Sequence, residues 1–293
     1  MAAALTAADL RTATGTSDEA TLAYALRWRV RGLRPGAHRG ADVGPSGHFR
    51  QVVPFDRSPD PRRIDLRASL RDPFDALYVR QFEQRAAAAV QLLVDTSASM
   101  AFDDGDGSAL ARATRLARRI VQAAHATGDA CGLTAGADTP AVERPALRQA
   151  ATEAVAALEY VPAAGAGIDA LVAAATALGR RRCLVFVLSD FAFPATAAAT
   201  LLDALALHDL VPIRFAHEAL RRLPRYGLAE LADRESHRRR LVWLRPALRA
   251  RWQAAEAAHQ ATIERLCRER DQPLLALTGS DGAEALSRHL LER

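Results

Sequence analysis

The chain has 293 residues and a formal net charge of +5, and all 39 of its basic residues are arginine because no lysine occurs. Aromatic residues make up only 5% of the sequence, which leaves few platforms for stacking nucleobases, and the arginines are interleaved with aspartate and glutamate. We therefore expect no nucleic-acid binding and assign the charge to solvated faces or protein contacts. A chain of this length buries a substantial core, as one large α/β domain with an appendage or as two small domains.

The cysteine content and the apolar runs indicate the cellular compartment in which the protein works. Cys131, Cys183 and Cys267 lie too far apart for a zinc site and are too few for a disulfide scaffold, so we expect reduced core residues. Asp9 and Arg11 interrupt the first apolar run before a signal-peptide core could form. No uncharged apolar stretch approaches the ~20 residues that span a bilayer. We expect a cytoplasmic protein without an integral membrane segment.

The first 75 residues predict an arm followed by an irregular segment. The stretch "SDEATLAYALRWRV" predicts a short helix with Ser17 as its N-cap. From Gly32 to Asp75, glycine, proline, aspartate and arginine are dense and apolar residues sparse, which predicts loops and short extended pieces. We therefore divide the chain into residues 1–75, an arm and a loop or extended segment packed on the main domain, and residues 76–293, an α/β domain.

From residue 76 onward, strands alternate with helices. Residues 76–82 have the period-two pattern of a strand, and residues 88–95 read as a fully buried strand. The remaining expected elements are helices at 108–128, 145–161, 168–179, 195–209, 246–271 and 282–292, and strands at 130–135, 182–190, 210–216, 241–244 and 273–278. This alternation predicts an α/β fold with a doubly wound, mostly parallel, Rossmann-like sheet and an irregular N-terminal extension.

Polar side chains follow two of the buried strands at the point where each strand ends. Asp95, Ser97 and Ser99 follow the strand at 88–95, and Asp190 ends the strand at 182–190. Ligands of open α/β sheets bind beyond the carboxyl ends of the strands, so we expect these side chains to converge on one edge. Oxygen donors of this kind suit a hard divalent cation such as Mg²⁺.

These residues also carry a resemblance to a known family. Asp95-x-Ser97-x-Ser99 after an apolar strand resembles the D-x-S-x-S signature of the von Willebrand factor A (vWA) domain, whose metal-ion-dependent adhesion site (MIDAS) lies on a doubly wound sheet. From Gly36 to Glu235 the sequence is similar to DUF58 proteins, including their Leu-Pro, Gly-Leu and Asp-x-Glu pattern near its end. The upstream positions that match this family are Asp60, Arg63, Ile64, Asp65, Arg67, Arg80 and Glu83.

Three positions depart from the family pattern. Leu66 replaces a tryptophan, and Ser58-Pro59-Asp60 replaces Gly-Asp-Asp. More seriously, a MIDAS usually takes a threonine from the loop that here reads "GAGID", where Gly167 or Ile168 offers no ligand. The adjacent Asp169 is the candidate substitute, with water as an intermediary.

A structural role without metal is the alternative for this motif. Asp95, Ser97 and Ser99 would then only cap the following helix and satisfy backbone donors. The set of four with Asp190 favours the metal site.

The resemblance implies a non-enzymatic adaptor or assembly factor. DUF58 proteins of the MxaS type are associated with MoxR-type AAA+ ATPases, so the implied partners are such an ATPase and a client enzyme complex that it helps to mature. A metal held by Asp95, Ser97, Ser99 and Asp190 would leave one coordination position for a carboxylate of the partner.

Two other functions stay open. A metal-independent protein-interaction scaffold with a vestigial MIDAS is favoured by the missing threonine. A metal-dependent phosphoester hydrolase would use the same carboxylates. Ser97, however, stands where a haloacid-dehalogenase phosphatase has its second aspartate, and a serine cannot shuttle protons near neutral pH.

The segment from Arg57 to Arg71 is a second candidate surface, because it is rich in arginine and aspartate. Two interpretations of it remain open. The residues either anchor an irregular loop through internal ion pairs or form a docking surface for an acidic partner loop. The residues concerned are Asp60, Arg63, Asp65 and Arg67.

Overall fold

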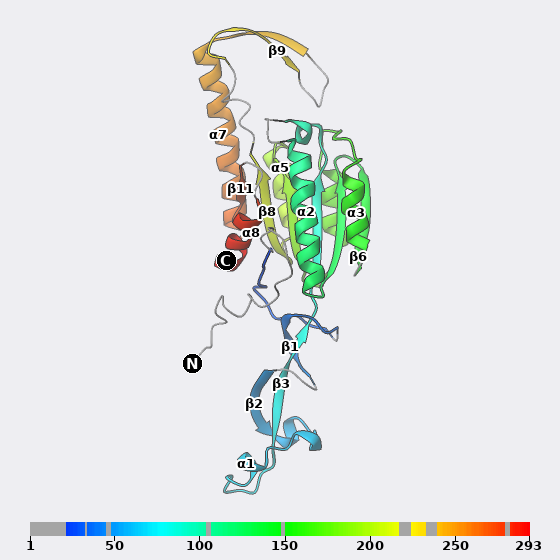
Figure 1. Cartoon of the computed structure of the whole chain (residues 1–293). Coiled ribbons are helices and arrows are strands. Elements are labelled where there is room, and N and C mark those ends of the chain that lie inside the picture. Colours follow the sequence, from blue (N-terminus) through cyan, green and yellow to red (C-terminus); the bar gives the residue numbers. More distant parts are fainter. Residues whose placement is uncertain are drawn as a thin grey trace.

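The main body of the molecule is a six-stranded sheet covered by helices (Figure 1). The computed structural model describes residues 22–32, 34–44, 48–103, 107–147, 150–216, 224–232, 239–278 and 282–293. In spatial order the strands are β11 (Leu275–Leu277), β8 (Asp209–Phe215), β7 (Leu184–Ser189), β4 (Ala89–Asp95), β5 (Ala130–Gly136) and β6 (Pro140–Leu147). Only the β5–β6 pair is antiparallel. The predicted α/β fold with a doubly wound, mostly parallel sheet is confirmed.

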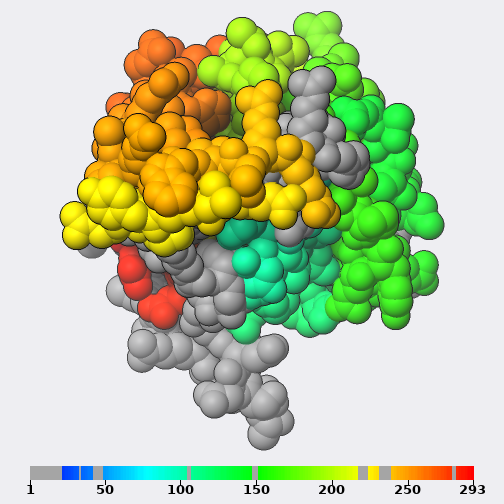
Figure 2. All heavy atoms as spheres, turned by 90° about the horizontal axis from the view of Figure 1, so that it is seen from above, coloured from blue at the N-terminus to red at the C-terminus, as the bar shows by residue number. Residues whose placement is uncertain are grey.

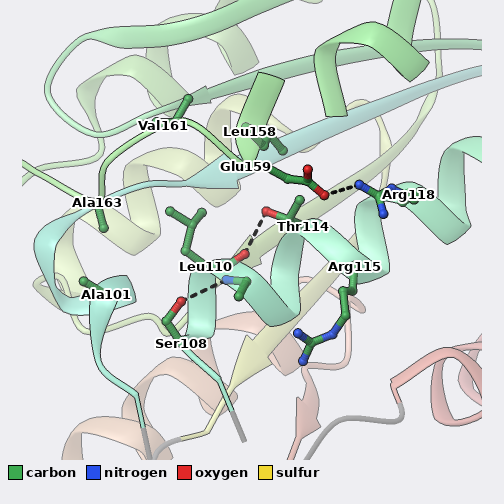
Figure 3. A pocket seen from close by; sticks show the side chains of 11 residues that line it. Ala101, Ser108, Leu110, Thr114, Arg115, Arg118, Leu158, Glu159, Val161 and Ala163 are labelled. Atoms are coloured by element: carbon green, nitrogen blue, oxygen red, sulfur yellow. Dashed lines mark hydrogen bonds and ion pairs between the residues drawn. The ribbon is translucent and has the colours of Figure 1, made fainter. Parts of the chain in front are cut away.

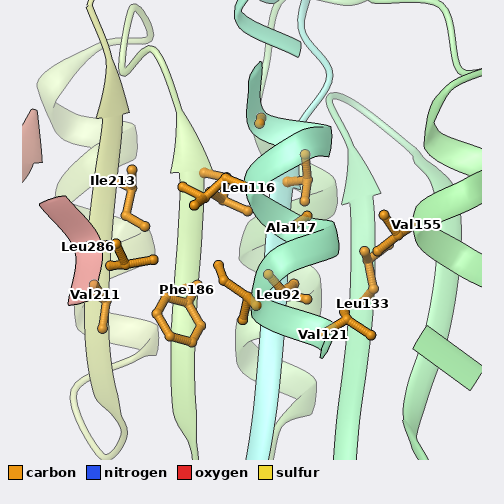
Figure 4. Packing of buried hydrophobic residues seen from close by; sticks show 14 of the residues in the cluster. Leu92, Leu116, Ala117, Val121, Leu133, Val155, Phe186, Val211, Ile213 and Leu286 are labelled. Carbon is orange, nitrogen blue, oxygen red and sulfur yellow. The ribbon is translucent and has the colours of Figure 1, made fainter. Parts of the chain in front are cut away.

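Helices cover both faces of this sheet because the strand residues alternate between two apolar clusters. One face carries α2 (Ala109–Ala126), α3 (Ala150–Leu158) and α8 (Gly282–Glu292), and the other carries α4 (Asp169–Ala177), α5 (Ala195–Ala204) and α7 (Pro246–Glu269). In β4, Leu92 belongs to the first cluster and Leu93 to the second. Figure 4 shows Leu92 and Phe186 of adjacent strands beneath Leu116 of α2.

Helix α2 begins at a well-formed cap. The Oγ of Ser108 accepts a hydrogen bond of 3.1 Å from the backbone N–H of Ala111, one of the donors that a helix start leaves without a partner. We predict that Ser108→Ala lowers the free energy of unfolding in urea by about 1 kcal/mol. Ser108→Asp is the control, because it keeps an acceptor at the cap. Equal stability of the alanine variant and the wild type would contradict the prediction.

The N-terminal part forms a separate antiparallel sheet in the order β1 (His38–Gly44), β3 (Tyr78–Ala86), β2 (His48–Pro54). Figure 1 shows it extending away from the main body at the end where β4 begins. The short helices η1 (Phe55–Arg57), η2 (Pro61–Arg63) and α1 (Leu66–Ser69) lie at its tip. Because β3 completes this sheet, the small unit reaches beyond residue 75 to Ala86.

The helix predicted after Ser17 is wrong for residues 22–30, where the chain is extended; residues 17–21 lie outside the described part. Alternate side chains of this strap point inward, with Leu22, Tyr24 and Val30 buried and the residues between them more exposed. Val30 forms a bridge with Gly40. Packing against the main core therefore overrides the local helix preference.

Two strands were not predicted. The expected helix at 145–161 starts later, at Ala150, because residues 140–147 form β6 at the edge of the sheet. Pro140 and Pro145 are tolerated there because an edge strand needs fewer ladder hydrogen bonds. Within the stretch expected to be polar and irregular, β9 (Gly227–Ala232) pairs with β10 (Arg239–Leu244) as a two-stranded ribbon.

A buried polar junction joins the strap and the small sheet to the main body. Asp129 is 1% exposed, and its Oδ2 accepts hydrogen bonds from the Tyr24 hydroxyl, from Thr127 Oγ1 at 2.9 Å and from His38 Nε2 at 2.6 Å. Its Oδ1 accepts a 2.7 Å bond from the backbone N–H of Ala88, which lies between β3 and β4. One carboxylate thus ties four parts of the chain together.

Gly36 brings the strap close to the β3–β4 connection. A Cβ at this position would lie 2.4 Å from the backbone N and Cα of Ala87. Only glycine allows this approach.

The cysteines are free and buried, as predicted. Burial raises the pKa of Cys131 to about 12 and of Cys183 and Cys267 to about 11, which makes all three poor nucleophiles. Among the described helices, none is long and apolar enough to cross a bilayer.

Candidate metal site at the carboxyl edge of the sheet

Asp95 is the last residue of β4 and is completely buried. Its Oδ1 accepts a 2.8 Å hydrogen bond from the backbone N–H of Ser97, and its Oδ2 accepts a 2.6 Å bond from Ser189 Oγ at the end of β7. Since β4 and β7 are neighbours, the direction of the chain progression reverses between them. Asp95 therefore lies at the switch point where ligands of such sheets bind.

The two serines of the motif present their hydroxyls to each other. Ser97 Oγ and Ser99 Oγ lie 3.0 Å apart, at the start of the short helix η3 (Ala98–Ala101). Ser97 is the N-cap residue of η3, yet its side chain makes no capping hydrogen bond. The capping interpretation therefore does not account for the hydroxyl of Ser97.

Asp190 follows β7 and is 8% exposed. Its Oδ1 accepts a 3.0 Å hydrogen bond from the backbone N–H of Ala192. The pKa of Asp95 is raised from its usual 3.8 to about 6, mainly because the carboxylate is buried and secondly because Asp190 carries a negative charge nearby. The structure thus brings Asp95, Ser97, Ser99 and Asp190 together as predicted, with two acidic groups that repel each other.

The loop that would supply the missing metal ligand does not place one at the site. Ile168 is 2% exposed and packs in the core with Leu93 and Phe191. Asp169 is exposed in the first turn of α4. Within the described residues, no three Asp, Glu, His or Cys side chains form a group that could hold a metal, so Asp169 does not join Asp95 and Asp190.

Sequence reasoning missed Asp138, which anchors this loop. Its Oδ1 accepts a 2.8 Å hydrogen bond from the N–H of Gly167, and its Oδ2 accepts a 3.3 Å bond from the N–H of Ala166. A Cβ at Gly167 would lie 2.5 Å from Asp138 Oδ1. A threonine cannot stand at Gly167 while Asp138 holds the loop. The sequence signal that could have identified Asp138 is its position just after the end of β5, the strand next to β4.

His259 of α7 is a second residue that sequence reasoning missed. Its Nε2 donates a 2.9 Å hydrogen bond to the carbonyl of Phe191, the residue after Asp190. Phe191 has a positive φ of 56°, which is unfavourable for a bulky residue. Its N–H donates to Ser189 Oγ at 2.9 Å, and its ring packs against Phe193. These contacts hold the turn that carries Asp190.

A groove of about 560 Å³ lies between α2 and the segment that follows α3, with Ala101 of η3 in its lining (Figure 3). Its walls are mostly apolar, from Leu110, Leu158 and Val161, with an Arg118–Glu159 ion pair at one end. Ser108 and Thr114 add hydroxyl groups to this lining.

The second predicted surface lies at the tip of the small sheet, at the opposite end of the molecule (Figure 1). Arg63 pairs with Asp60 at 2.9 Å, and Arg80 pairs with Asp65 at 2.7 Å. The pKa of Asp65 is lowered mainly by the hydrogen bond from Arg80. Asp65 also accepts hydrogen bonds from the backbone N–H groups of Arg67 and of the next residue. These contacts match the internal ion-pair interpretation for Asp60, Arg63 and Asp65.

The family model described as "Protein of unknown function DUF58" matches residues 51–262, which is most of the chain. The chain belongs to the DUF58 family. It is 29% identical over 263 residues to the uncharacterized protein Rv1480 of Mycobacterium tuberculosis and, to the same extent, to the uncharacterized protein Mb1516 of Mycobacterium bovis. Each match covers 88% of this chain and 82% of the relative.

Two solved structures are similar to this DUF58 protein over most of their own length. The conserved hypothetical protein BatB from Bacteroides thetaiotaomicron is 16% identical, with a TM-score of 0.48, and the match covers 70% of this chain and 98% of BatB. The SpRpn10 VWA domain is also 16% identical, with a TM-score of 0.42, and the match covers 70% of this chain and 95% of that domain.

The donor set of this DUF58 protein fits a hard divalent cation. Mg²⁺ prefers oxygen ligands and keeps several waters, so two carboxylates and two hydroxyls suffice. A cation would also offset the burial of the Asp95 carboxylate and its repulsion by Asp190, which both raise the pKa of Asp95. Asp95, Ser97, Ser99 and Asp190 are the residues that would hold it.

Proposed function

We propose that this DUF58 protein is a non-enzymatic adaptor that binds protein partners through a Mg²⁺ ion at its MIDAS-like edge. The observation that carries the proposal is the buried, mutually repelling pair Asp95 and Asp190 beside two serine hydroxyls. Two carboxylates at the ends of adjacent buried strands destabilise the metal-free protein, and a cation offsets that cost. The ion would supply a Lewis-acidic position for a partner carboxylate, and the protein residues would position it.

We further propose that the partners are a MoxR-type AAA+ ATPase and a client enzyme complex. This step rests on membership of the DUF58 family and on the MxaS-type resemblance of the sequence. In this function the protein's residues bind and orient the partner and perform no bond-breaking step.

The test compares wild type and Asp95→Asn, each in Mg²⁺ and in EDTA, as bait in host lysate, with mass spectrometry of the recovered proteins. Calorimetric titration with Mg²⁺ alone accompanies it. We expect a Mg²⁺-binding isotherm and recovery of a MoxR-type ATPase only with wild type in Mg²⁺. Recovery of no such ATPase in any sample would contradict the ATPase partnership.

A metal-independent scaffold is the second candidate, because Ile168 occupies the threonine position and is buried in the core. Equal ATPase recovery in all four samples, without a Mg²⁺ isotherm, would establish it. A phosphoester hydrolase would instead turn over p-nitrophenyl phosphate, and the turnover would disappear in Asp95→Asn.

The bond from His259 to Phe191 gives a further prediction. His259→Ala removes a hydrogen bond from the turn that carries Asp190, so we expect the Kd for Mg²⁺ to rise about fivefold. His259→Gln keeps a side-chain N–H donor and is expected to bind within twofold of wild type. Calorimetric titration checks both. An unchanged Kd in the alanine variant would show that ring packing alone holds the turn.

A further inference from the structure

The β9–β10 ribbon exposes an unusual number of large apolar side chains. Tyr226, Leu228, Leu241 and Trp243 are each between 56% and 68% exposed, and we call these four residues the ribbon face. Trp243 pairs directly with Leu228 across the two strands. Strand side chains alternate, so Leu241 and Trp243 share one side, while Leu244, on the other side, is completely buried.

The exposure of these apolar side chains to water is unfavourable for the protein on its own. A two-stranded ribbon is only marginally stable without something packed on its faces. Contiguous exposed apolar side chains typically mark an interaction site. Tryptophan and tyrosine are also the residue types that contribute most to protein interfaces.

Among the described residues of the ribbon and its two ends, the charges are nearly all positive. Arg225, Arg239 and Arg245 are exposed near it, Arg240 is exposed on the other side of the ribbon, and Glu230 is the only acidic residue in the described residues 224–232 and 239–245. Glu230 is engaged by Arg239 at 3.6 Å. An occupant of this surface therefore needs apolar side chains for the centre and acidic side chains for the rim.

The location of the ribbon also favours an acidic occupant. Figure 1 places it beyond the carboxyl ends of the main strands, at the end that carries Asp95. Figure 2 looks onto this end and shows the ribbon lying across the surface. A metal at Asp95 and Asp190 would also select carboxylates, although this one step rests on the proposed function.

We propose that the ribbon face is the docking surface for an acidic, apolar-containing segment of a partner protein. A lipid surface fits less well, because Glu230 lies directly opposite Leu241 on the same side and would enter the apolar layer. Single-stranded nucleic acid also fits less well, because Leu228 and Leu241 provide no stacking surface. The apolar centre and the arginine rim act together, so both contribute to affinity.

The test measures fluorescence anisotropy of a labelled 12-residue peptide, in which aspartate and glutamate alternate with leucine and valine, against the full chain in EDTA. We expect saturable binding that weakens when salt is raised. Leu241→Ser combined with Trp243→Ser should raise the Kd at least tenfold, and Arg239→Glu combined with Arg245→Glu should do the same. These side chains are exposed, and thermal melts of each variant confirm that the fold is intact.

The matched control replaces two apolar residues elsewhere that are even more exposed. Leu70 and Phe74, near the tip of the small sheet, are 86% and 87% exposed. The double variant Leu70→Ser with Phe74→Ser is expected to bind the peptide like wild type. An equal loss in this control would contradict a specific ribbon surface.

Other probes decide the class of occupant. Three results would each overturn the proposal: tighter binding of a single-stranded oligonucleotide, tighter binding of phosphatidylserine vesicles, or a dimer that dissociates in the Trp243→Ser variant. Equal binding of a peptide with glutamine and serine in place of the acids, or no peptide binding, would also overturn it. Because the assay is run in EDTA and repeated with Asp95→Asn, its failure leaves the metal proposal standing, and a failed Mg²⁺ titration leaves the ribbon proposal standing.

Discussion

Asp95→Asn is expected to stabilise the metal-free protein. The carboxylate of Asp95 is buried beside Asp190, and its pKa is raised from 3.8 to about 6. At neutral pH this displacement corresponds to a cost of about 3 kcal/mol. Asparagine removes the charge and keeps an acceptor for the N–H of Ser97 and a polar partner for Ser189. We expect the free energy of unfolding in EDTA at pH 7.5 to rise by about 2 kcal/mol.

The sign of the pH dependence follows from the direction of the pKa shift. The folded protein holds the proton on Asp95 more tightly than the unfolded chain does. The corresponding stability is fully present below pH 3.8 and is lost as the pH rises through about 6. The stability of wild type relative to Asp95→Asn should therefore fall across this window, as measured by urea unfolding in EDTA.

Magnesium should reverse the order of the two proteins. At a concentration one hundred times its Kd, a ligand that binds only the folded state adds about 2.7 kcal/mol. Wild type should gain this stability and Asp95→Asn should not. A variant that is less stable than wild type in EDTA at pH 7.5 would contradict the account of two repelling carboxylates.

Asp129→Ala is expected to cause the largest loss of stability among these variants, about 3 to 5 kcal/mol. The carboxylate is the shared acceptor for Tyr24, His38, Thr127 and the N–H of Ala88. Removing it leaves several buried polar groups without this acceptor, and each such group costs about 1 to 3 kcal/mol. Urea unfolding in EDTA measures the loss.

The control for this prediction is Asp271→Asn, which removes the charge with a residue type that tolerates the positive φ of 55° at this position. Asp271 pairs with Arg27 of the same strap at 2.7 Å, but its side chain is 84% exposed. Exposed ion pairs contribute at most about 1 kcal/mol, so this variant should stay close to wild type. Similar losses in both variants would contradict the special role of the buried carboxylate.

The main sheet was predictable because its parallel strands are largely apolar runs, which can be recognised without knowledge of their neighbours. The site was predictable for a related reason, since Asp95 and Asp190 each end such a run. Parallel strands then bring the two ends to one edge.

The missed elements depend on partners that are distant in the sequence. Residues 22–30 are extended because Leu22 and Tyr24 reach the main core. The ribbon strand β9 forms only by pairing with β10. The roles of Asp138 and His259 follow from hydrogen bonds to the backbone of other loops, and a backbone N–H or carbonyl is the same group whichever residue carries it.

The connection between β3 and β4 has a mechanical consequence. Only Ala87 and Ala88 separate these strands, both are buried, and Asp129 holds the N–H of Ala88. The small sheet is therefore held firmly to the main body rather than joined to it by a flexible linker. A load applied at its tip would be transmitted along a nearly continuous strand to Asp95. Two bodies held at the two ends of the molecule would be kept at a set spacing and orientation.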